Sequence, residues 1–390
     1  MRVTDVMRCT GKKLVCLTGV MCCSALMAAV LPEERADIMY HRYSGGGITI
    51  DGPSLLVRKD IAGTVSVSGN YYVDNVTSAS IDVEASGASE EYTEERTEYT
   101  VGADYLYDKA IMSISYTSSD ENDYEAETVA FGISQDFFGD LTTITLGYAM
   151  GDDTVLRSDK PDFEESTERQ NFRFGISQVT TPSLLLTFNY EAVTDEGYLN
   201  NPYRVYRFVD PNDPTVASTQ TEVYPRTHTS DAFALGGKYY LPYRAALGLN
   251  YRYFTDDWGI DAQTIELEYT HPFRENWIFD VRLRHYQQTA AYFYSDLHQT
   301  ISADEKDFRA RDKELSEYTT MTFGFGISYE FKLSSAEWID KSSVSFNYDR
   351  ISFDYDNFTD LTKRGNNALG DEPLYSFDAD VIRLFLSVWY

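Results

Sequence analysis

Charged residues of both signs recur at every second position in several stretches of the sequence. This is the spacing of side chains that share one face of a β-strand. Three consecutive stretches place Arg252, then Glu266 and Glu268, and then Arg282 and Arg284 on one side. The charged candidates for lining an interior are Arg173, Glu191, Arg252, Glu266, Glu268, Arg282 and Arg284. Facing rows of arginine and glutamate would create a transverse field that orders solutes in a pore. The alternative is that these charges neutralise one another and only fill the interior, since enclosed charges need partners in either case.

A catalytic arrangement is harder to find. His228 and Ser230 lie two positions apart, so they could share a strand face as base and nucleophile. No third residue that would orient the histidine is identifiable, and patterns for phosphate loops, dinucleotide sites and zinc proteases are absent. The four cysteines all lie within the first 32 residues, at Cys9, Cys16, Cys22 and Cys23. The rest of the chain therefore has no thiolate for a metal, a nucleophile or a disulfide, and we expect no enzyme.

Acidic residues cluster in three predicted connections. The clusters are Asp120, Glu121, Asp123 and Glu125; Asp152, Asp153, Asp162, Glu164 and Glu165; and Asp304, Glu305 and Asp307. Carboxylate oxygens suit Ca²⁺ or Mg²⁺, but none of the clusters has the spacing of an EF-hand loop. We favour a solvated acidic rim that holds divalent ions loosely, and we expect no other cofactor.

The composition excludes one large class of partners. The chain of 390 residues has 33 Lys and Arg against 62 Asp and Glu, a formal net charge of −29. Such a surface repels phosphate backbones, so we expect no binding to nucleic acid. Tyrosine (31) outnumbers phenylalanine (22), which suits surfaces that lie partly in lipid and partly in water.

The N-terminal part of the sequence is predicted to have two roles. A basic start, an apolar run from Leu14 to Leu31 and small residues near its end predict a secretory signal peptide over residues 1–32. Residues 33–60 are expected to form a periplasmic segment that plugs the interior, or else a loosely attached arm. The candidate plug residues are His41, Arg42, Gly45, Gly46 and Gly47.

Alternation of apolar and polar residues recurs from residue 61 to the end of the chain. The tetrapeptide Phe-Gly-Ile-Ser occurs at 131–134, 174–177 and 325–328, each time with Gly and Ser on the side opposite the apolar pair. The pattern predicts about fourteen strands. The connections between them alternate between long and short, with 255–259 as the one short member of the long set. We therefore predict an all-β, closed antiparallel transmembrane barrel over residues 61–390, with short periplasmic turns and long outer loops.

The last predicted strand alternates up to its final residue, the aromatic Tyr390. This ending resembles the terminal-strand signal of bacterial outer-membrane proteins, which the barrel-assembly machinery reads. An ordinary edge strand is the alternative, although an open edge of this kind would promote aggregation.

Several separate motifs resemble, in the same order, a bacterial family known as domain of unknown function 3570. They are 43–47 (Tyr-Ser-Gly-Gly-Gly), 52–54 (Gly-Pro-Ser), 56–59 (Leu-Val-Arg-Lys), 72–74 (Tyr-Val-Asp), 78–83 (Ser-Ala-Ser-Ile-Asp-Val), 197–204 (Gly-Tyr-Leu-Asn-Asn-Pro-Tyr-Arg), 293–296 (Phe-Tyr-Ser-Asp) and 310–316 (Ala-Arg-Asp-Lys-Glu-Leu-Ser). The resemblance implies an outer-membrane protein of Gram-negative bacteria and carries over no activity or functional residue. Family genes often lie near genes for a periplasmic flavin transferase and a thioredoxin-like protein, a hint of envelope redox partners.

Together these patterns predict a channel or transporter for small polar solutes in the outer membrane of a Gram-negative bacterium. The alternative is a non-conducting scaffold that docks other envelope proteins through its loops. In the loop 194–229, tyrosines interleave with arginines, the residue types enriched at interaction hot spots. Outer-membrane lipid, lipopolysaccharide and the barrel-assembly machinery are the other partners we expect.

Overall fold

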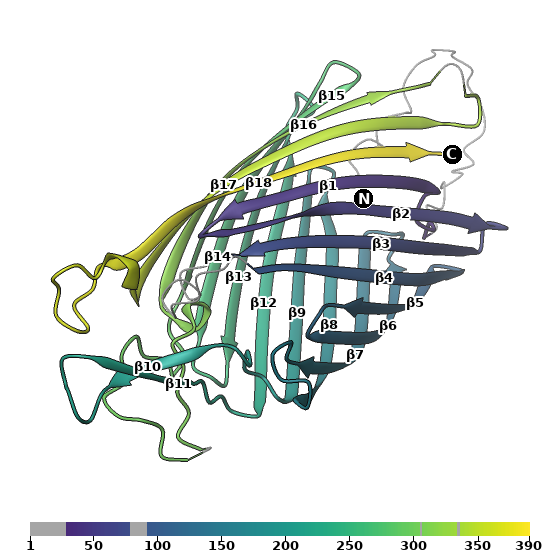
Figure 1. Ribbon diagram of the computed structural model, residues 1–390. Helices are drawn as coiled ribbons and strands as arrows, with labels where there is room; N and C mark the ends of the chain where they lie inside the picture. The colour runs from purple at the N-terminus through teal and green to yellow at the C-terminus, as the bar shows by residue number, and fades with distance from the viewer. Residues whose placement is uncertain (1–28, 79–91, 305, 334–335) are drawn as a thin grey trace, which may run out of the picture.

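The strands predicted from the alternation form one closed antiparallel barrel. The computed structural model describes residues 29–78, 92–304, 306–333 and 336–390 (Figure 1). Residues 1–28 of the predicted signal peptide lie outside these ranges. No helix among the described residues has the length and apolarity needed to span a membrane. The predicted fold class is confirmed, but the described residues contain sixteen barrel strands instead of about fourteen.

Neighbours in the barrel follow chain order, with the first strand closing against the last. The first nine strands are β1 (Arg35–Gly45), β2 (Ile48–Ile61), β3 (Val65–Ser78), β4 (Tyr92–Tyr107), β5 (Ala110–Asp120), β6 (Tyr124–Phe137), β7 (Thr142–Leu156), β8 (Glu164–Thr181) and β9 (Leu184–Gly197). The remaining barrel strands are β12 (Thr227–Tyr240), β13 (Ala246–Asp256), β14 (Asp261–Phe273), β15 (Trp277–Gln288), β16 (Tyr318–Phe331), β17 (Lys341–Thr359) and β18 (Leu374–Trp389). Outside the barrel lie a two-stranded sheet of β10 (Val205–Val209) and β11 (Ala217–Thr221) and the short 3₁₀-helices η1 (Lys313–Leu315) and η2 (Leu361–Lys363).

The two faces of the barrel wall differ in polarity. Large apolar side chains point outward, and Tyr99, Leu235 and Leu249 remain 57%, 59% and 56% exposed. The inner face carries mainly small and polar residues, as in β13, where Gly248, Asn250 and Arg252 alternate with outward Leu249 and Tyr251. A belt of exposed apolar side chains around the wall is unfavourable in water but favourable in lipid. The closed barrel is also compatible with lipid, because it leaves no strand edge unpaired. The chain is therefore an outer-membrane β-barrel.

The predicted N-terminal plug is wrong, because this segment completes the wall. β1 pairs with β18 from Arg35 opposite Trp389 to Gly45 opposite Ala379, and it pairs with β2 on its other side. Gly46 and Gly47, with φ of 60° and 78°, form the two-residue hairpin turn between these strands. Such a turn needs positive φ at both positions, which glycine adopts without strain. The barrel therefore begins at Arg35, and β1 and β2 are the two strands that the sequence interpretation missed.

The connections confirm the predicted difference between the two ends. At the end where the chain termini lie, the described turns are short, and the longest is 332–340 (Figure 1). The opposite, outer end carries the long connections 198–226, 289–317 and 360–373, together with the short turns 46–47, 121–123 and 257–260. β10 and β11 belong to the first of these and lie beyond the ends of the barrel strands in Figure 1.

Candidate functional site

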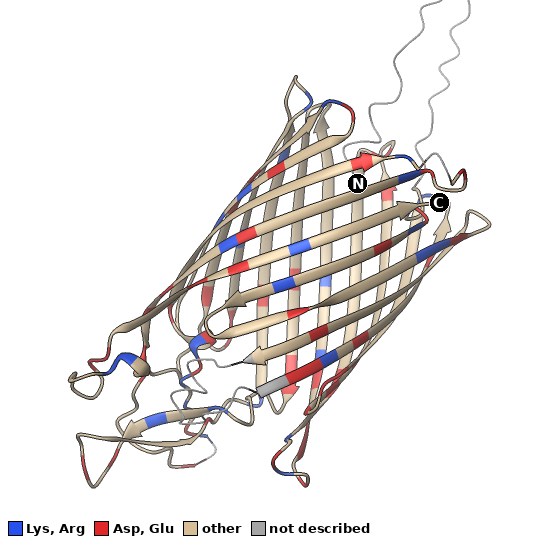
Figure 2. Cartoon of the chain, turned by 45° about the horizontal axis from the view of Figure 1, so that its top comes forward, with Lys and Arg blue, Asp and Glu red and all other residues tan. Residues whose placement is uncertain are grey.

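The charged candidates all lie on the inner face of the barrel. Charged residues of both signs are spread along the barrel strands (Figure 2). On β8 and β9, the Nε of Arg173 lies 3.0 Å from Oε1 of Glu191. The amide of Asn171 donates to the same oxygen over 2.9 Å. This pair fits the neutralising interpretation, because each charge has its partner on the adjacent strand.

The β14 glutamates pair differently from the sequence interpretation. Glu268 lies opposite Arg282 in register, but its carboxylate contacts Lys238 at 3.5 Å. Arg282 instead reaches across β16 to Asp349 on β17, and Arg383 on β18 binds the other oxygen of the same carboxylate. Two arginines therefore share one aspartate.

A glycine makes room for this contact between strands that are not neighbours. Gly324 lies between Arg282 and Asp349, and a Cβ atom at this position would lie 2.3 Å from the aspartate Oδ1. Any larger residue on β16 would obstruct the path between the arginine and the carboxylate. Alternation assigns both charged residues to the inner face, but nothing local to either one indicates that they meet.

Arg252 and Arg284 keep their charges available to the lumen. Both side chains are exposed, and among the described residues neither forms an ion pair. Arg252 lies over the ring of Phe254, 5.5 Å from its centre. Glu266, directly opposite Arg284 in register, is half-buried. The predicted row of arginine and glutamate is thus present on the wall, but its members are only partly neutralised.

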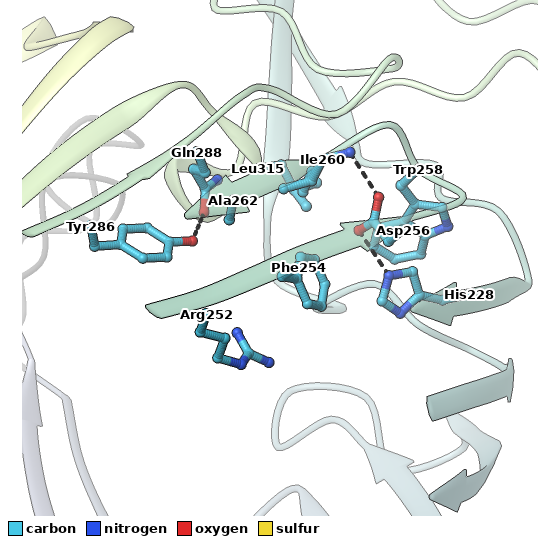
Figure 3. A pocket seen from close by; sticks show the side chains of 10 residues that line it. All are labelled: His228, Arg252, Phe254, Asp256, Trp258, Ile260, Ala262, Tyr286, Gln288 and Leu315. Carbon is cyan, nitrogen blue, oxygen red and sulfur yellow. Dashed lines mark hydrogen bonds and ion pairs between the residues drawn. The ribbon is translucent and has the colours of Figure 1, made fainter. Parts of the chain in front are cut away.

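A cavity of about 270 Å³ lies at the outer end of the same wall (Figure 3). Its lining residues come from β12 to β15 and from the loops above them: His228, Arg252, Phe254, Asp256, Trp258, Ile260, Ala262, Tyr286, Gln288 and Leu315. Leu315 belongs to the loop 289–317, so this loop covers one side of the outer mouth. Trp258, Asp256 and Leu315 were not among the sequence candidates. Only the fold of the loops brings Trp258 and Leu315 to the lumen, whereas Asp256 ends β13 on the inner face of Arg252, so alternation could have found it.

His228 is held by carboxylates on both sides. Its Nε2 lies 3.0 Å from Asp256 and its Nδ1 lies 3.3 Å from Asp195. A carboxylate can only accept, so both ring nitrogens donate and the imidazole carries a positive charge. A general base needs a free nitrogen, and this arrangement provides none. Ser230, the nucleophile weighed with this histidine, is buried.

The outer loops pack into a structured cap, made of the described residues of 198–226, 257–260, 289–317 and 360–373. Its apolar core contains Tyr224, Trp258, Phe293 and Leu315, and lumen-facing Phe254 packs against it. Backbone hydrogen bonds join Val223 to Arg309 in both directions. These loops therefore have a core of their own.

A buried ionic network holds the cap together. Arg207, 5% exposed, donates to Asp296 over 2.7 Å and to Glu372 over 2.9 Å. Arg311 binds the other oxygen of Asp296 at 3.0 Å. Burial by itself would raise the pKa of Asp296, but Arg311 and Arg207 outweigh it, so the pKa lies below its ordinary value. Burial would also raise the pKa of Glu372, but the hydrogen bond and charge of Arg207, together with backbone hydrogen bonds, outweigh it, so this pKa is lowered as well.

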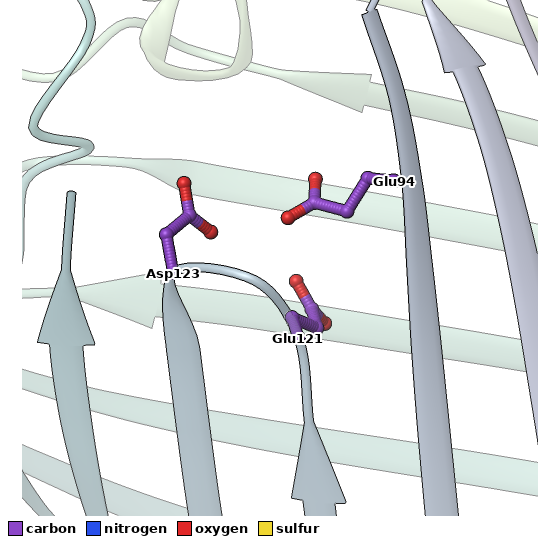
Figure 4. A group of neighbouring side chains, drawn as sticks. All are labelled: Glu94, Glu121 and Asp123. Carbon is purple, nitrogen blue, oxygen red and sulfur yellow. The ribbon is translucent and has the colours of Figure 1, made fainter. Parts of the chain in front are cut away.

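One acidic group could accommodate a cation. Glu94, at the outer end of β4, lies beside Glu121 and Asp123 of the turn after β5 (Figure 4). One oxygen from each residue lies within 4.8 Å of the others, a spacing compatible with ligands of Ca²⁺. The Nε of Arg96 lies 3.6 Å from Oε1 of Glu121, so this arginine would compete with a cation for the glutamate. Burial raises the pKa of Glu121 although Arg96 opposes this change. Glu121 and Asp123 belong to the predicted acidic rim. Glu305, which is also part of that prediction, lies outside the described residues.

The remaining sequence candidates belong to the wall and its closure. His41 points inward, where it bonds Asp74 at 2.7 Å and stacks on Tyr72. Arg42 is exposed on the outward face, so it does not enter the lumen as the plug hypothesis required. The Tyr390 hydroxyl donates to the carbonyl of Arg58 on β2 over 3.1 Å. The final aromatic therefore reaches past β1 at the barrel closure.

Comparison with known proteins gives one family. The family described as "Protein of unknown function (DUF3570)" matches residues 77–172 and 156–352. The search of curated proteins found no match.

Among solved structures, the chain is similar to a bacterial polysaccharide outer membrane secretin, with 7% identity, a TM-score of 0.49, and coverage of 91% of this chain and 98% of the other. It is also similar to the siderophore receptor PirA from Pseudomonas aeruginosa, with 10% identity, a TM-score of 0.42, and coverage of 91% and 62%. A loop-deletion mutant of OmpT, an outer membrane protein of Vibrio cholerae, has 10% identity, a TM-score of 0.40, and coverage of 91% and 98%. At these identities no activity is carried over to this chain.

Proposed function

Because the chain belongs to the DUF3570 family, a membership that assigns no activity, we propose a function from the barrel itself: a passive outer-membrane channel for small polar solutes. The observation that carries the proposal is a closed wall of sixteen strands, among the described residues, with a polar inner face. Barrels of eight strands can be filled by their own side chains, whereas barrels of sixteen leave an aqueous passage.

The inner wall supplies the chemistry for passage. Small residues such as Ser113, Ser115 and Gly132 leave space along β5 and β6. Exposed Arg252 and Arg284 offer charge to a passing solute on the opposite part of the wall. A solute would enter beside the cap, exchange water contacts for these polar groups, and leave at the periplasmic turns. No covalent step is proposed.

The direct test is single-channel recording of the purified, detergent-solubilised protein in planar bilayers. We expect discrete conductance steps. The substitution Ser115→Trp places a large ring on the inner face of β5 and should lower the conductance of each step. The neighbouring Ile114→Trp is the matched control, because Ile114 faces lipid and is 49% exposed. A barrel that remains folded but electrically silent would remove the proposal, and equal effects of both variants would contradict passage through the lumen.

The scaffold alternative receives less support. It was based on tyrosines and arginines in the loop 194–229, but Tyr206, Tyr224 and Arg207 are buried within the cap. These three residues contact other loops of the same chain and are not free to dock a partner, whereas Tyr203 and Arg226 stay exposed, so the expected docking surface is reduced. Contact with lipopolysaccharide at the rim and recognition of Tyr390 by the barrel-assembly machinery stay predictions.

A further inference from the structure

We propose that the outer cavity binds a small organic anion, a carboxylate on an apolar or aromatic body, and that a series of arginines leads this anion down the wall. The proposal rests on the channel function proposed above and names its solute class. It uses two features that the passage of an uncharged solute does not require: the charge of the cavity and the placement of four arginines.

The cavity has an apolar body. Phe254, Ile260, Ala262 and Leu315 supply most of its non-polar lining, and Trp258 closes one side (Figure 3). Its volume of about 270 Å³ is comparable to the lower end of the range for small-molecule sites. A compact ring or a short aliphatic chain could lose its hydration shell there, which favours a solute that is not purely polar.

The polar groups of the cavity leave one positive charge. Asp256 is neutralised by His228 and also accepts from the backbone of Ile260 over 2.7 Å. The Tyr286 hydroxyl donates to Gln288, so both groups are engaged with each other. Arg252 is the remaining ionic group, and it has no ion-pair partner among the described residues. Its planar guanidinium can bind a carboxylate with two parallel hydrogen bonds.

Further arginines continue from this position toward the periplasm. Arg252 lies in the inward row of Tyr286, with Thr264 between them. On β15, Arg284 and Arg282 occupy the next two inward rows. Arg383 on β18 is in the fourth row, reached from Asp280 through Gly326 and Asn347. Successive inward residues of one strand are about 6.6–6.8 Å apart, which is the spacing of Arg284 and Arg282 on β15. The steps from Arg252 on β13 and to Arg383 on β18 also cross strands that lie about 4.7–4.9 Å apart, so the four arginines form a stepwise series down the wall.

The carboxylates of these rows are less exposed than Arg252 and Arg284, the two arginines without an ion pair among the described residues. Asp349, shared by Arg282 and Arg383, is 5% exposed, and Glu266 and Glu268 are half-buried. Arg252 and Arg284, in contrast, are exposed. At Arg252 and Arg284 a solute in the lumen therefore meets the guanidinium group before the neighbouring carboxylates of Glu266 and Glu268. The strongly negative net charge of the chain does not decide the field at this wall, because charges beyond about 8 Å are screened at physiological salt.

The test compares three probes of similar size in the folded, full-length barrel: benzoate, benzyl alcohol and benzylamine. Calorimetric titration should detect benzoate, with weaker binding of the alcohol and none of the amine. Arg252→Gln should weaken benzoate binding about tenfold, the loss expected for a charged hydrogen-bonded contact. Arg42→Gln, which removes the same charge from the outward face, should leave the affinity unchanged.

Bilayer recordings distinguish failure of this inference from failure of the channel. A reversal potential in a sodium benzoate gradient should show anion preference, and this preference should fall in Arg252→Gln and Arg284→Gln. A conducting barrel that prefers cations and does not bind benzoate would overturn the anion site and leave the channel standing. Equal binding of benzyl alcohol and benzoate would also overturn it. A silent barrel that still binds benzoate through Arg252 would remove the channel and uphold the site.

Discussion

At the scale of single residues, the wall combines partly neutralised charges with close packing between strands. Asp349 holds two arginines, and Gly324 leaves the space in which the first of them reaches it. Arg252 and Arg284 have no such contact among the described residues, and their charged groups stay exposed to the lumen. The effect of a substitution therefore depends on whether the residue is an exposed lumen charge, a shared counter-ion or a point of close backbone approach.

The shared carboxylate predicts a change in ion selectivity. Asp349→Asn removes the counter-ion of Arg282 and Arg383, so the lumen gains one positive charge and should favour anions more strongly. The reversal potential in a KCl gradient measures this shift. Asp378→Asn is the control, because this carboxylate binds Arg350 at 2.8 Å on the outward face. A selectivity that moves equally in both variants would show that only the overall charge matters.

A close approach of two strands predicts a loss of stability. A Cβ atom on Gly52 would lie 1.8 Å from the carbonyl oxygen of Val73, and a backbone atom cannot move aside as a flexible side chain can. Gly52→Ala should destabilise the barrel by about 1–3 kcal/mol, the usual cost of overpacking. The measurement is the temperature at which the folded band on a gel shifts to the unfolded position. Gly69→Ala is the control, since a Cβ there meets nothing within 4 Å, and equal shifts would refute the packing argument.

At the scale of elements, the outer loops behave as a unit. The described residues of 198–226, 289–317 and 360–373 come from distant parts of the sequence and meet at Arg207, Asp296 and Glu372. Buried ion pairs are strongly destabilised when one partner is removed, since the other charge is left without compensation. The cap should therefore open through loss of this network.

Acid should open the cap. The pKa values of Asp296 and Glu372 are lower in the folded cap than in free chains, so their stabilising contribution is complete above the ordinary pKa of about 4 and is lost as pH falls below it. A variant that keeps Trp258 as its only tryptophan should show a red-shifted emission between pH 4 and pH 2. Emission that stays constant down to pH 2 would contradict the stabilising role of this ionic network.

Removing the central arginine should have the same effect at neutral pH. Arg207→Met leaves the carboxylate of Glu372, whose side chain is 0% exposed, without its main partner. We expect a loss of about 3–5 kcal/mol from the cap. The same single-tryptophan emission should be red-shifted already at pH 7. Arg226→Met is the comparison, because its pair with Glu165 is largely exposed and should contribute little.

At the scale of the whole molecule, closure joins the two ends of the described barrel. β1 pairs with β18 and β2, and the Tyr390 hydroxyl bonds the backbone of β2. Without β1 and β2, the edges of β3 and β18 would be unpaired in lipid, where each free backbone group is costly. The N-terminal segment is thus part of the wall and cannot act as a removable plug.

Deletion of residues 35–61 should therefore abolish the folded barrel instead of widening its conductance. Heat-modifiable mobility on gels, followed by bilayer recording of any folded fraction, tests this expectation. Deletion of residues 211–215, at the turn between β10 and β11, is the control and should leave the barrel folded. A folded barrel with larger conductance after the first deletion would restore the plug hypothesis.

The sequence by itself determined the class of the fold and the side on which most wall residues lie. Alternation is a local property with a period of two, so Arg252, Glu266 and Arg284 could be assigned to one face before their neighbours were known. The alternating lengths of the connections determined which end carries the loops. β1 and β2 were not predicted from the alternation, because Gly46, Gly47 and the Gly52-Pro53 pair resemble a turn or an irregular segment.

Only the tertiary structure decided which charges meet and which stay available. Arg282 and Asp349 are 67 positions apart and lie on strands separated by a third, so no local spacing connects them. Arg207 and Glu372 are 165 positions apart and come together only after the loops fold on one another. A side chain's direction follows from its own strand, whereas its partner depends on barrel closure and loop packing, which are properties of the whole chain.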